Sequence, residues 1–414
     1  MKKKIVYVSS RPPFPMIGGR EHMIVQSLKF LSEEFDVHVL CFHNRGEGVL
    51  VQPILDVGVK SVDLVAMAGS IEFVRNVFLR SSNSFQENLY YSKKTKQYIL
   101  HYINSLNPAV VICDMLRTSQ FVKGLSIPLV VDFDDMLSSR YEKIINGNSE
   151  FSSLGTYADR LPFYLRWLES LARNLIVGFE RRRIEAAEYL AFQYADLIIF
   201  TSPVEARKAN EKYNSNKALG ISQQVNVTQD CICTFSNKNE NIKLLFIGNM
   251  TTAQNLASLS IIVGELLPLL RDIPNLSLKV IGRFDQRAEY IIKDEKRVEL
   301  LGFVENIIDV AQECSLALMP VAFGTGVKTK VLDAMSMGLP VITNEVGAEG
   351  IDVVSGTNIL IANSNAELAA SVTTLLKSDA LFADISSAGR EYVNRYHSYS
   401  FLKNRYIDFV KSVL

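Results

Sequence analysis

The chain has 414 residues, of which 48% are hydrophobic, and its 44 basic residues balance its 44 acidic ones. This length predicts about two domains, each large enough to bury a core. Because the formal net charge is zero, no overall field favours nucleic acid, and any basic binding surface has to be local. We therefore expect no nucleic-acid partner.

Targeting and cysteine patterns disfavour several other classes of protein. Residues 1–10 contain basic residues but an apolar run too short for a signal peptide, and no segment has the roughly eighteen apolar residues of a membrane span. The five cysteines fit a reducing cytosol better than a disulfide framework. Cys231 and Cys233 form an isolated Cys-x-Cys, which disfavours a metal site. We expect a cytoplasmic protein with no metal and no cofactor.

The first half of the chain alternates strand and helix patterns. A short apolar strand is predicted first, followed by a Pro/Gly loop, an amphipathic helix and a second strand, at residues 3–10, 11–19, 20–34 and 36–42. Further apolar strands follow at 109–115, 127–133 and, after a long helical region, 195–202. This alternation is typical of a parallel, doubly wound sheet.

The pattern restarts after residues 214–241, which are rich in Asn, Ser and Gln and are interpreted as a linker with one strand. The strands predicted beyond the linker are 242–248, 276–282, 298–303, 316–321, 339–343 and 358–362, with helices such as 256–271 and 366–377. We predict an α/β protein of two Rossmann-like parallel-sheet domains facing a cleft. The predicted domains cover residues 1–225 and 240–390, and an aromatic-rich helix over 391–414 is expected to pack back on the N-terminal domain.

A Gly-rich turn between a strand and a helix, in residues 318–350, predicts an anion site. Gly324 and Gly326 let backbone N–H groups approach a ligand, and the N-terminus of the helix adds a positive dipole end. Lys328 and Lys330 bring positive charge, and Asp333 is spaced to accept hydrogen bonds from hydroxyl groups such as those of a ribose. The alternative is a plain turn with solvated lysines.

A second glycine loop precedes the first helix. Gly18 and Gly19 lie at the carboxyl end of the first strand, where open α/β sheets bind ligands. A nearby ligand would explain two consecutive glycines; a glycine-led helix start is the alternative. Glu21 and His22 are candidates on the helix face, although an isolated His is more often structural than catalytic.

Several ordered motifs carry a resemblance to a known family. They are FIGNM, VIGR, LLGFV, the block MPVAFGTGVKTKVLDAMSMGLPVIT and GAEGI in the second half, and PPFPMIGG and ADLIIFTSPVE in the first. The chain resembles the retaining family-four (group 1) glycosyltransferases, whose fold is named GT-B. The resemblance covers most of the second half and is weaker in the first.

The resemblance implies a donor site in the second domain. Asp333 takes the position of the acid that binds the ribose, usually a glutamate, and Thr325 stands where the family often has a glutamate that contacts the donor sugar. The backbone from Gly324 to Val327 would hold donor groups, and Lys328 would approach the pyrophosphate.

The remaining donor positions differ from the family pattern in the electrostatic charge of their side chains. Asn249 and Asn255, near Gly248, stand where many relatives have Arg and Lys, so phosphate neutralisation would fall on Arg283, Lys328 or Lys330. The alternative for Arg283 is a surface charge after a strand. The backbone from Gly302 to Val304, which includes Phe303, resembles the region that brackets the base.

The first domain would supply the acceptor side. Asp134 takes the position of a His that many relatives have near the donor sugar, with Asp132 and Asp135 beside it to orient acceptor hydroxyls or to counter a cationic group. The triplet from Asp132 to Asp134 also imitates an Asp-x-Asp metal site, which we disfavour because two-Rossmann enzymes stabilise the leaving diphosphate with dipoles and basic residues. Glu188 is interpreted as either a cleft residue or a solvated one.

The chemistry implied by the resemblance needs no dedicated base. Preorganised amides and cations would hold the departing diphosphate, and in a retaining reaction a phosphate oxygen would take the proton of the acceptor. We assign catalytic roles to Asp134, Gly19 and Lys328. The donor-binding set is Gly18, Gly19, Gly248, Asn249, Arg283, Phe303, Val304, Gly324, Thr325, Gly326, Val327, Lys328, Lys330 and Asp333.

A basic amphipathic stretch, residues 160–183, contains the only tryptophan, Trp167. It predicts contact with an anionic membrane at the inner face of the plasma membrane, and the alternative is a helix packed on its own domain. We expect a metal-independent glycosyltransferase that moves a sugar from a UDP- or GDP-sugar to a glycan, lipid-linked or protein acceptor in surface polysaccharide synthesis. The alternatives are a catalytically silent GT-B partner subunit and a sugar-nucleotide epimerase.

Overall fold

The computed structural model describes residues 2–145, 163–226, 241–324 and 326–414, and it describes only the backbone of residues 163–175. The chain divides into two compact units. The first comprises Met1–Gln223 with Lys403–Leu414, and the second comprises Gln224–Leu402. Thr325, Cys231 and Cys233 lie outside the described residues, as do residues 160–162 of the predicted membrane-binding stretch.

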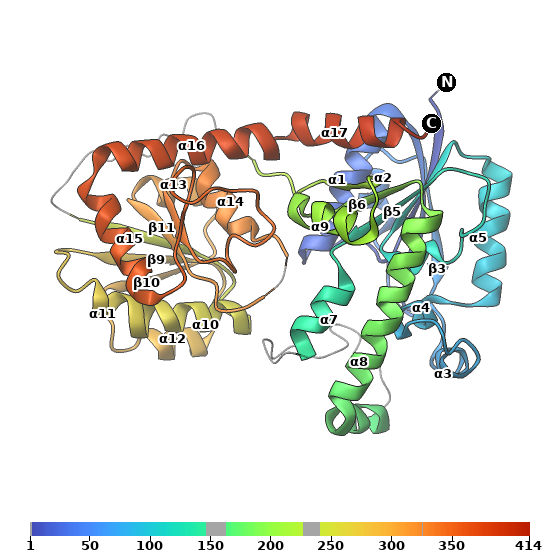
Figure 1. Ribbon diagram of the computed structural model, residues 1–414, viewed down its shortest axis with the longest axis horizontal. Helices are drawn as coiled ribbons and strands as arrows, with labels where there is room; N and C mark the ends of the chain where they lie inside the picture. Colours follow the sequence, from blue (N-terminus) through green and yellow to red (C-terminus); the bar gives the residue numbers. More distant parts are fainter. Residues whose placement is uncertain (1, 146–162, 227–240, 325) are drawn as a thin grey trace. The chain divides into compact units, whose positions relative to one another are not determined.

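The first unit is built on a seven-stranded parallel sheet with the order β3-β2-β1-β4-β5-β6-β7 (Figure 1). Its strands are β1 Lys4–Ser9, β2 Asp36–His43, β3 Ser61–Ala66, β4 Val110–Asp114, β5 Leu129–Asp134, β6 Leu197–Phe200 and β7 Ala218–Gly220. Its helices are α1 Gly19–Glu34, α2 Val51–Leu55, α3 Ser70–Leu79, α4 Phe85–Tyr90, α5 Lys93–Leu106, α6 Leu116–Ser119, α7 Leu137–Ile145, α8 Phe163–Tyr194 and α9 Pro203–Tyr213.

The second unit is built on a six-stranded parallel sheet with the order β10-β9-β8-β11-β12-β13. Its strands are β8 Lys243–Ile247, β9 Ser277–Ile281, β10 Val298–Gly302, β11 Leu316–Met319, β12 Val341–Thr343 and β13 Leu360–Ile361. Its helical segments are α10 Ala253–Ile261, the π-helix η2 Ile262–Leu266, α11 Leu267–Leu269, α12 Gln286–Ile292, α13 Ile307–Gln312, α14 Thr329–Ser336, α15 Asn365–Lys377 and α16 Asp379–His397. The predicted class, two parallel-sheet α/β domains, is confirmed.

Several elements differ from the sequence-based expectation. The helix expected over 256–271 begins at Ala253 and continues through the π-helix into α11, where Pro268 occupies the first turn. The helix expected over 391–414 is two helices, α16 and α17 Tyr399–Lys411, which are separated at Ser398. Because α16 packs on α14 and α15, the second unit extends to Leu402 instead of ending at 390.

Helix α17 is tied to the first unit by both apolar and charged contacts. Tyr406 is buried and its ring lies 6.0 Å from that of Phe30 on α1. Lys403 Nζ lies 2.6 Å from Glu33 Oε2, and Lys411 Nζ lies 3.1 Å from Glu34 Oε2. The final residues of the chain are therefore part of the first unit's structure.

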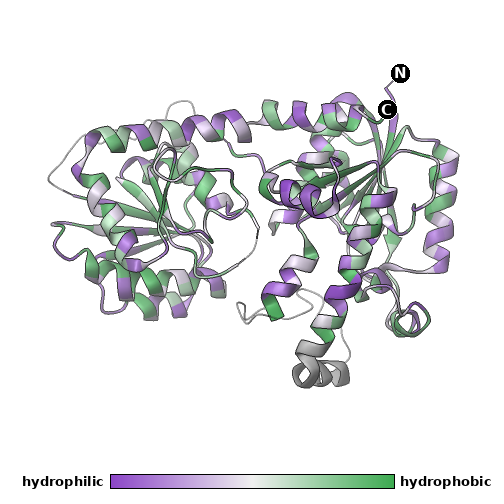
Figure 2. Cartoon of the chain, viewed as in Figure 1, coloured by the Kyte–Doolittle hydropathy of each residue, from purple (hydrophilic) through white to green (hydrophobic). Residues whose placement is uncertain are grey.

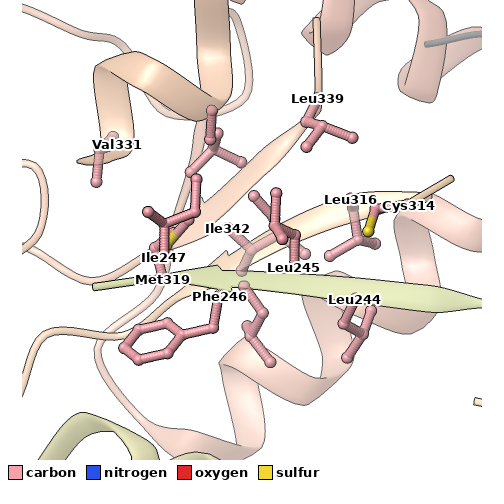
Figure 3. Packing of buried hydrophobic residues seen from close by; sticks show 14 of the residues in the cluster. Leu244, Leu245, Phe246, Ile247, Cys314, Leu316, Met319, Val331, Leu339 and Ile342 are labelled. Carbon is pink, nitrogen blue, oxygen red and sulfur yellow. The ribbon is translucent and has the colours of Figure 1, made fainter. Parts of the chain in front are cut away.

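Both sheets have apolar interiors, with hydrophilic residues concentrated on the outer helices (Figure 2). In the second unit, Leu244, Leu245 and Phe246 of β8 pack with Leu316 and Ile342 of the neighbouring strands (Figure 3). Strands buried on both faces explain the continuous apolar runs in the sequence. Among the described helices, none is long and apolar enough to cross a membrane.

The strand order places a topological switch point in each unit. It lies between β1 and β4 in the first unit and between β8 and β11 in the second. Open α/β sheets bind ligands at this place, outside the carboxyl ends of the strands. The loops that follow β1, β4, β8 and β11 are therefore the first places to look for function.

A close backbone approach fixes the carboxyl ends of β8 and β9. Gly282 has φ +130°, and a Cβ atom there would lie 1.9 Å from the carbonyl oxygen of Gly248. The N–H of Gly248 donates to Ile281 O at 2.9 Å, and the N–H of Gly282 donates to Gly302 O at 2.8 Å. Only glycine fits this position, so the loops after β8, β9 and β10 lie side by side.

Replacing Gly282 tests this approach. Gly282→Ala is expected to destabilise the protein by more than about 2 kcal/mol, because the methyl group overlaps backbone and the φ angle is unfavourable. Thermal unfolding of the intact chain measures the loss. The control is Gly264→Ala, in a helical segment where the added Cβ meets nothing within 4 Å; there we expect a gain of roughly 0.5–1 kcal/mol. Equal effects of both substitutions would contradict the argument.

Candidate functional site

The second unit presents a cationic site at its switch point. Lys330, in the first turn of α14, donates from Nζ to Asn255 Oδ1 at 2.9 Å. Asn255 follows β8 and Lys330 follows β11, so this bond spans the switch point. Asn255 Nδ2 in turn donates to the carbonyl oxygen of Asn249 at 3.0 Å. The two asparagines therefore position the lysine.

The environment of Lys330 depresses its basicity. Its Nζ lies 4.8 Å from the ring centroid of Phe246. Burial, together with the nearby positive charge of Lys328, lowers the pKa of Lys330 from 10.5 to about 8. No described carboxylate forms an ion pair with Lys330. A half-buried ammonium held by an amide and an aromatic ring, with no ion-pair partner among the described residues, is suited to receive an anion.

The glycine turn after β11 is packed against α10. Gly324 has φ +133°, and a Cβ atom there would lie 2.9 Å from Gln254 Nε2. The N–H of Ala322 donates to Ser258 Oγ at 3.2 Å. Gly326 has φ +78°, and its carbonyl oxygen accepts from Lys328 Nζ at 2.6 Å. The turn thus holds Lys328, which is buried, at the start of α14.

Helix α14 begins at Thr329 without a side-chain cap. The N–H of Val331 donates to the carbonyl oxygen of Lys328 at 2.9 Å, which leaves the N–H groups of Thr329 and Lys330 and the positive dipole end at the switch point. One turn further on, burial raises the pKa of Asp333 from 3.8 to about 6. Among the described residues, none donates a hydrogen bond to the Asp333 carboxylate. Its oxygens are therefore suited to accept hydrogen bonds from the hydroxyl groups of a ligand.

The remaining predicted donor residues lie on the neighbouring strand ends. The carbonyl oxygen of Arg283 accepts from the N–H of Met250 at 2.7 Å, whereas its side chain is exposed and makes no hydrogen bond with a described residue. Phe303, after β10, is 76% exposed, and Val304 packs against the core. Gly248, Asn249, Arg283 and Phe303 therefore form a row of strand ends that leads away from Lys330.

In the first unit, the structure places a buried arginine among three aspartates. Arg20, on α1, donates from Nε to Asp114 Oδ1 at 2.7 Å and also forms a short contact through Nη2. Its guanidinium lies 2.9 Å from Asp132 Oδ2 and 3.4 Å from Asp134 Oδ1. Sequence reasoning missed Arg20 and Asp114. An acid at the end of an apolar strand, repeated in two adjacent strands, was the signal that could have found the cluster.

The charges of this cluster are unevenly matched. Burial raises the pKa of Asp132 to about 6, even though Arg20 opposes that shift. For Asp114, burial acts in the same direction, but Arg20 and the N–H of Ser10 hold its pKa below the ordinary value. The cluster, which we name the Arg20 cluster, comprises Arg20, Asp114, Asp132 and Asp134. One guanidinium faces three carboxylates, and the raised pKa of Asp132 means that it binds a proton more readily than Asp114 does.

Asp134 is the partly exposed member of the Arg20 cluster, with 23% of its side chain exposed. Its backbone has φ +68°, unusual for a residue other than glycine, and Thr201 Oγ1 donates to its Oδ1 at 2.8 Å. A strained backbone persists where the surrounding structure holds it in place, and such residues cluster at functional sites. In the structure, the positive charge that faces Asp132 and Asp134 belongs to Arg20, whereas an Asp-x-Asp site would place a metal ion there. Among the described residues, no group of three His, Cys, Asp or Glu could hold a metal ion.

The glycine loop before α1 is satisfied largely by the protein itself. Glu21 Oε2 accepts from the N–H of Gly18 at 3.0 Å, and a Cβ at Gly18 would lie 2.7 Å from that oxygen. Glu21 also pairs with Arg11 at 3.2 Å. A local helix start thus explains Gly18 without a ligand. Gly19 is exposed and has open space around it, and His22 is exposed.

Glu188 was interpreted as either a cleft residue or a solvated one. The structure fits neither interpretation, because Glu188 is buried and caps a helix. Its Oε1 accepts from the N–H of Ser138 at 3.0 Å and its Oε2 from Ser138 Oγ at 2.6 Å, at the start of α7. Two turns earlier on α8, Glu180 accepts from the N–H of Phe85 at 2.8 Å, at the start of α4. Helix α8 therefore holds two other helices through buried carboxylates.

The comparisons with known proteins begin with the family match. Residues 241–378, within the second unit, match the family model described as glycosyl transferases group 1. A curated Klebsiella pneumoniae protein, described as an uncharacterized 44.6 kDa protein in cps region, is 24% identical over 179 residues, 40% of this chain and 43% of that protein. The match therefore spans less than half the length of that curated relative.

Solved structures match nearly the whole chain. Anabaena HepE, in complex with UDP and glucose, has a TM-score of 0.61 and 15% identity, over 99% of this chain and 100% of that chain. Sucrose-phosphate synthase from Thermosynechococcus elongatus has a TM-score of 0.63 and 13% identity over 100% and 99%. The lipopolysaccharide outer core galactosyltransferase WaaB has a TM-score of 0.63 and 13% identity over 99% and 100%. The fold is thus GT-B, and with the family match it supports a GT-B glycosyltransferase.

The buried caps on α8 lead to a pH prediction. Burial raises the pKa of Glu188 from 4.5 to about 7. The contribution of Glu188 to the free energy of unfolding is therefore fully present below pH 4.5 and is lost as the pH rises through about 7. Glu188→Gln, which mimics the neutral acid, should therefore gain thermal stability relative to the native protein between pH 5 and pH 8.

Glu185, on the same helix, is the matched control. Its hydrogen bond with Lys212 lowers its pKa, so it stabilises the protein above pH 4.5 and loses that effect as the pH falls. Glu185→Gln should give a small loss of melting temperature at pH 8 that shrinks toward pH 4. If the Glu188→Gln difference does not change with pH, the assignment of Glu188 as a buried acid is wrong.

Proposed function

We propose that this protein is a retaining, metal-independent glycosyltransferase that transfers a hexosyl group from a nucleoside-diphosphate sugar to a glycan or lipid-linked acceptor. The observation that carries the proposal is the Lys330–Asn255 bond across the switch point of the second unit, with an uncapped helix start beside it. A nucleoside diphosphate is the ligand that brings both an anion for this cationic site and ribose hydroxyls for Asp333.

The donor is proposed to bind along the strand ends of the second unit. Its diphosphate would lie at the start of α14 between Lys328 and Lys330, and its ribose would donate to Asp333. The backbone from Gly302 to Val304 would contact the base, and Arg283 would swing in from its exposed position. Structures of Anabaena HepE with UDP and with UDP-glucose support UDP-glucose as the first donor to test.

Catalysis is proposed to rest on stabilisation of the leaving diphosphate. Negative charge grows on the diphosphate as the sugar becomes cationic, and preorganised N–H groups and ammonium groups stabilise that charge more than they stabilise the bound donor. A diphosphate oxygen would take the proton of the acceptor hydroxyl, so no side-chain base is required. Lys328 would have a catalytic role because it lies at the glycine turn that faces the leaving group.

The first unit is proposed to contribute the acceptor-binding group. Asp134 presents a partly exposed carboxylate at the carboxyl edge of the sheet, held by Thr201 and Arg20. Arg20 is a positioning residue in this proposal, since it is buried and acts through Asp134. Gly19, with open space around it, would let an acceptor approach the start of α1.

The pathway is proposed from the relatives. WaaB is described as a lipopolysaccharide outer core galactosyltransferase, and the Klebsiella protein is described as lying in a cps region. These descriptions support our proposal of a role in the synthesis of a surface polysaccharide.

A silent partner subunit is the second candidate, because a specific observation favours it. Positions 249 and 255 carry asparagines where the family has cations, and Asp333 is shorter than the usual glutamate. A protein of this kind would bind a nucleotide sugar without turning it over. An epimerase has less support, because we assign the titratable groups of the switch point, Lys330 and Asp333, to the diphosphate and the ribose and not to the sugar.

Donor binding is tested with UDP and UDP-glucose by calorimetry. Lys330→Gln and Asp333→Ala should each weaken UDP binding by at least tenfold, since each removes a charged hydrogen-bonding partner. Lys293→Gln is the control, because this exposed lysine of the second unit pairs only loosely with Asp294, at 3.9 Å. If UDP binds and both variants bind it like the native protein, the site is elsewhere. If UDP, GDP, ADP and CDP all fail to bind, the transferase proposal is overturned.

The acceptor role is tested by turnover of UDP-glucose with a panel of glycan and lipid acceptors. Asp134→Asn should lower kcat at least tenfold and leave the Kd of UDP within twofold, and Arg20→Lys should show the same split because it misplaces Asp134. Asp196→Asn is the control, since that carboxylate bonds the N–H of Leu129 at the opposite end of β5. An unchanged kcat in Asp134→Asn would contradict the acceptor role.

A further inference from the structure

Helix α3 exposes apolar side chains that a surface helix normally buries. Ile71, Phe78 and Leu79 are 89%, 77% and 76% exposed, whereas the three large apolar residues exposed on the described part of α8 are each only about half exposed. The only buried residue of α3 is polar, Asn76. Large apolar residues exposed singly need no explanation, but three on one ten-residue helix mark an interaction surface.

The helix is held in place by polar contacts that leave this face uncovered by described residues. Asn76 Nδ2 donates to the carbonyl oxygens of Asn88 at 3.1 Å and Tyr91 at 2.7 Å. Arg80, just after the helix, donates to Gln120 at 2.9 Å and lies 3.6 Å from the ring centroid of Tyr91. Helix α3 packs on α4 and is visible at the periphery of the first unit (Figure 1). Its position is therefore fixed without the apolar face.

The segment around α3 is basic in a chain with no net charge. Between residues 69 and 96 the basic residues are Arg75, Arg80, Lys93, Lys94 and Lys96, and the acidic ones are Glu72 and Glu87. Glu87 is buried as a cap of α4, and Glu72 pairs with Arg75 at 3.5 Å. The lysines at the start of α5 are free of described ion pairs. Arg75, Lys93 and Lys94 are exposed, whereas Arg80 and Lys96 are half-buried.

We infer that α3 docks on an anionic lipid surface. Ile71, Phe78 and Leu79 would enter the boundary between headgroups and acyl chains, and Arg75, Lys93 and Lys94 would lie among the anionic headgroups. This combination of apolar and basic groups fits a membrane surface better than a second copy of the chain, whose α3 would bring the same positive charge. Because binding to vesicles is measured without a donor, the inference does not depend on the proposed transferase activity.

This assignment differs from the stretch 160–183 predicted from the sequence. In the described part of that stretch, Glu180 is buried as a cap, and the Arg183 guanidinium lies 3.5 Å from the ring centroid of Phe179. Those side chains are engaged in contacts within the first unit. We therefore place the principal membrane contact on α3.

The test is cosedimentation of the intact chain with sucrose-loaded vesicles of phosphatidylcholine, with and without about 30% phosphatidylglycerol. Binding is expected only to the anionic vesicles and should weaken with salt. The triple variant Ile71→Ser, Phe78→Ser, Leu79→Ser should lose at least tenfold in partition coefficient. Arg75→Gln with Lys93→Gln and Lys94→Gln should lose a similar factor.

Two controls keep the outcome specific. Leu269→Ser with Tyr290→Ser removes exposed apolar groups from the second unit, and Phe179→Ser with Arg182→Gln alters the described part of α8; both should bind like the native protein. Unchanged thermal unfolding of the α3 variants shows that they fold. The inference is overturned if the native protein stays in solution with anionic vesicles, or if only the α8 variant loses binding. It is also overturned if the α3 variants lose self-association into a dimer, the competing role of this face, while their vesicle binding is unchanged.

Discussion

A single buried guanidinium holds the carboxyl edge of the first unit together. Arg20 comes from α1, Asp114 from β4, and Asp132 and Asp134 from β5, so their contacts join three elements at one point. Three carboxylates packed together would repel each other by several kcal/mol in this environment if the cation were removed. The arrangement stabilises the edge only as a unit, because a buried member left without its ion-pair partner would be costly. Asp134, the one member that reaches solvent, inherits its orientation from the rest.

The second unit meets the same topological constraint with the opposite charge. At its switch point lies an ammonium without an anionic partner among the described residues and, one turn away, a carboxylate without a described hydrogen-bond donor. Burial disfavours the charged form of both groups, which is the direction of both pKa shifts. A ligand that supplies phosphate to Lys330 and hydroxyl groups to Asp333 would relieve both costs at once. These unmet costs support the nucleotide-sugar site that we propose for this edge.

The pattern of apolar residues predicted the two sheets, because strands buried on both faces appear in the sequence as continuous apolar runs. It failed for β3, whose residues are mostly half-buried and give no such run, and for the break between α16 and α17, which depends on packing around α14. The glycine turn, Lys330 and Asp333 were predictable because they are close in sequence. Arg20 was not, since its partner Asp114 lies 94 residues away and only the strand order brings them together. Glu188 was misread for the same reason: its partner Ser138 is 50 residues earlier.

The structure also changes how the departures from the family pattern should be weighed. Asn249 and Asn255 replace cations expected at this edge, which suggests a weakened phosphate site when only the sequence is considered. In the folded chain, Asn255 bonds both Asn249 and Lys330, and the ring of Phe246 lies beside the ammonium. The asparagines thus move the positive charge from the β8 loop to α14 and fix it there. A cation that is positioned in advance loses less side-chain entropy on binding than a mobile surface arginine, so fewer charges can achieve the same stabilisation. The exchange of charge for positioning therefore removes one sequence-based argument for a silent subunit.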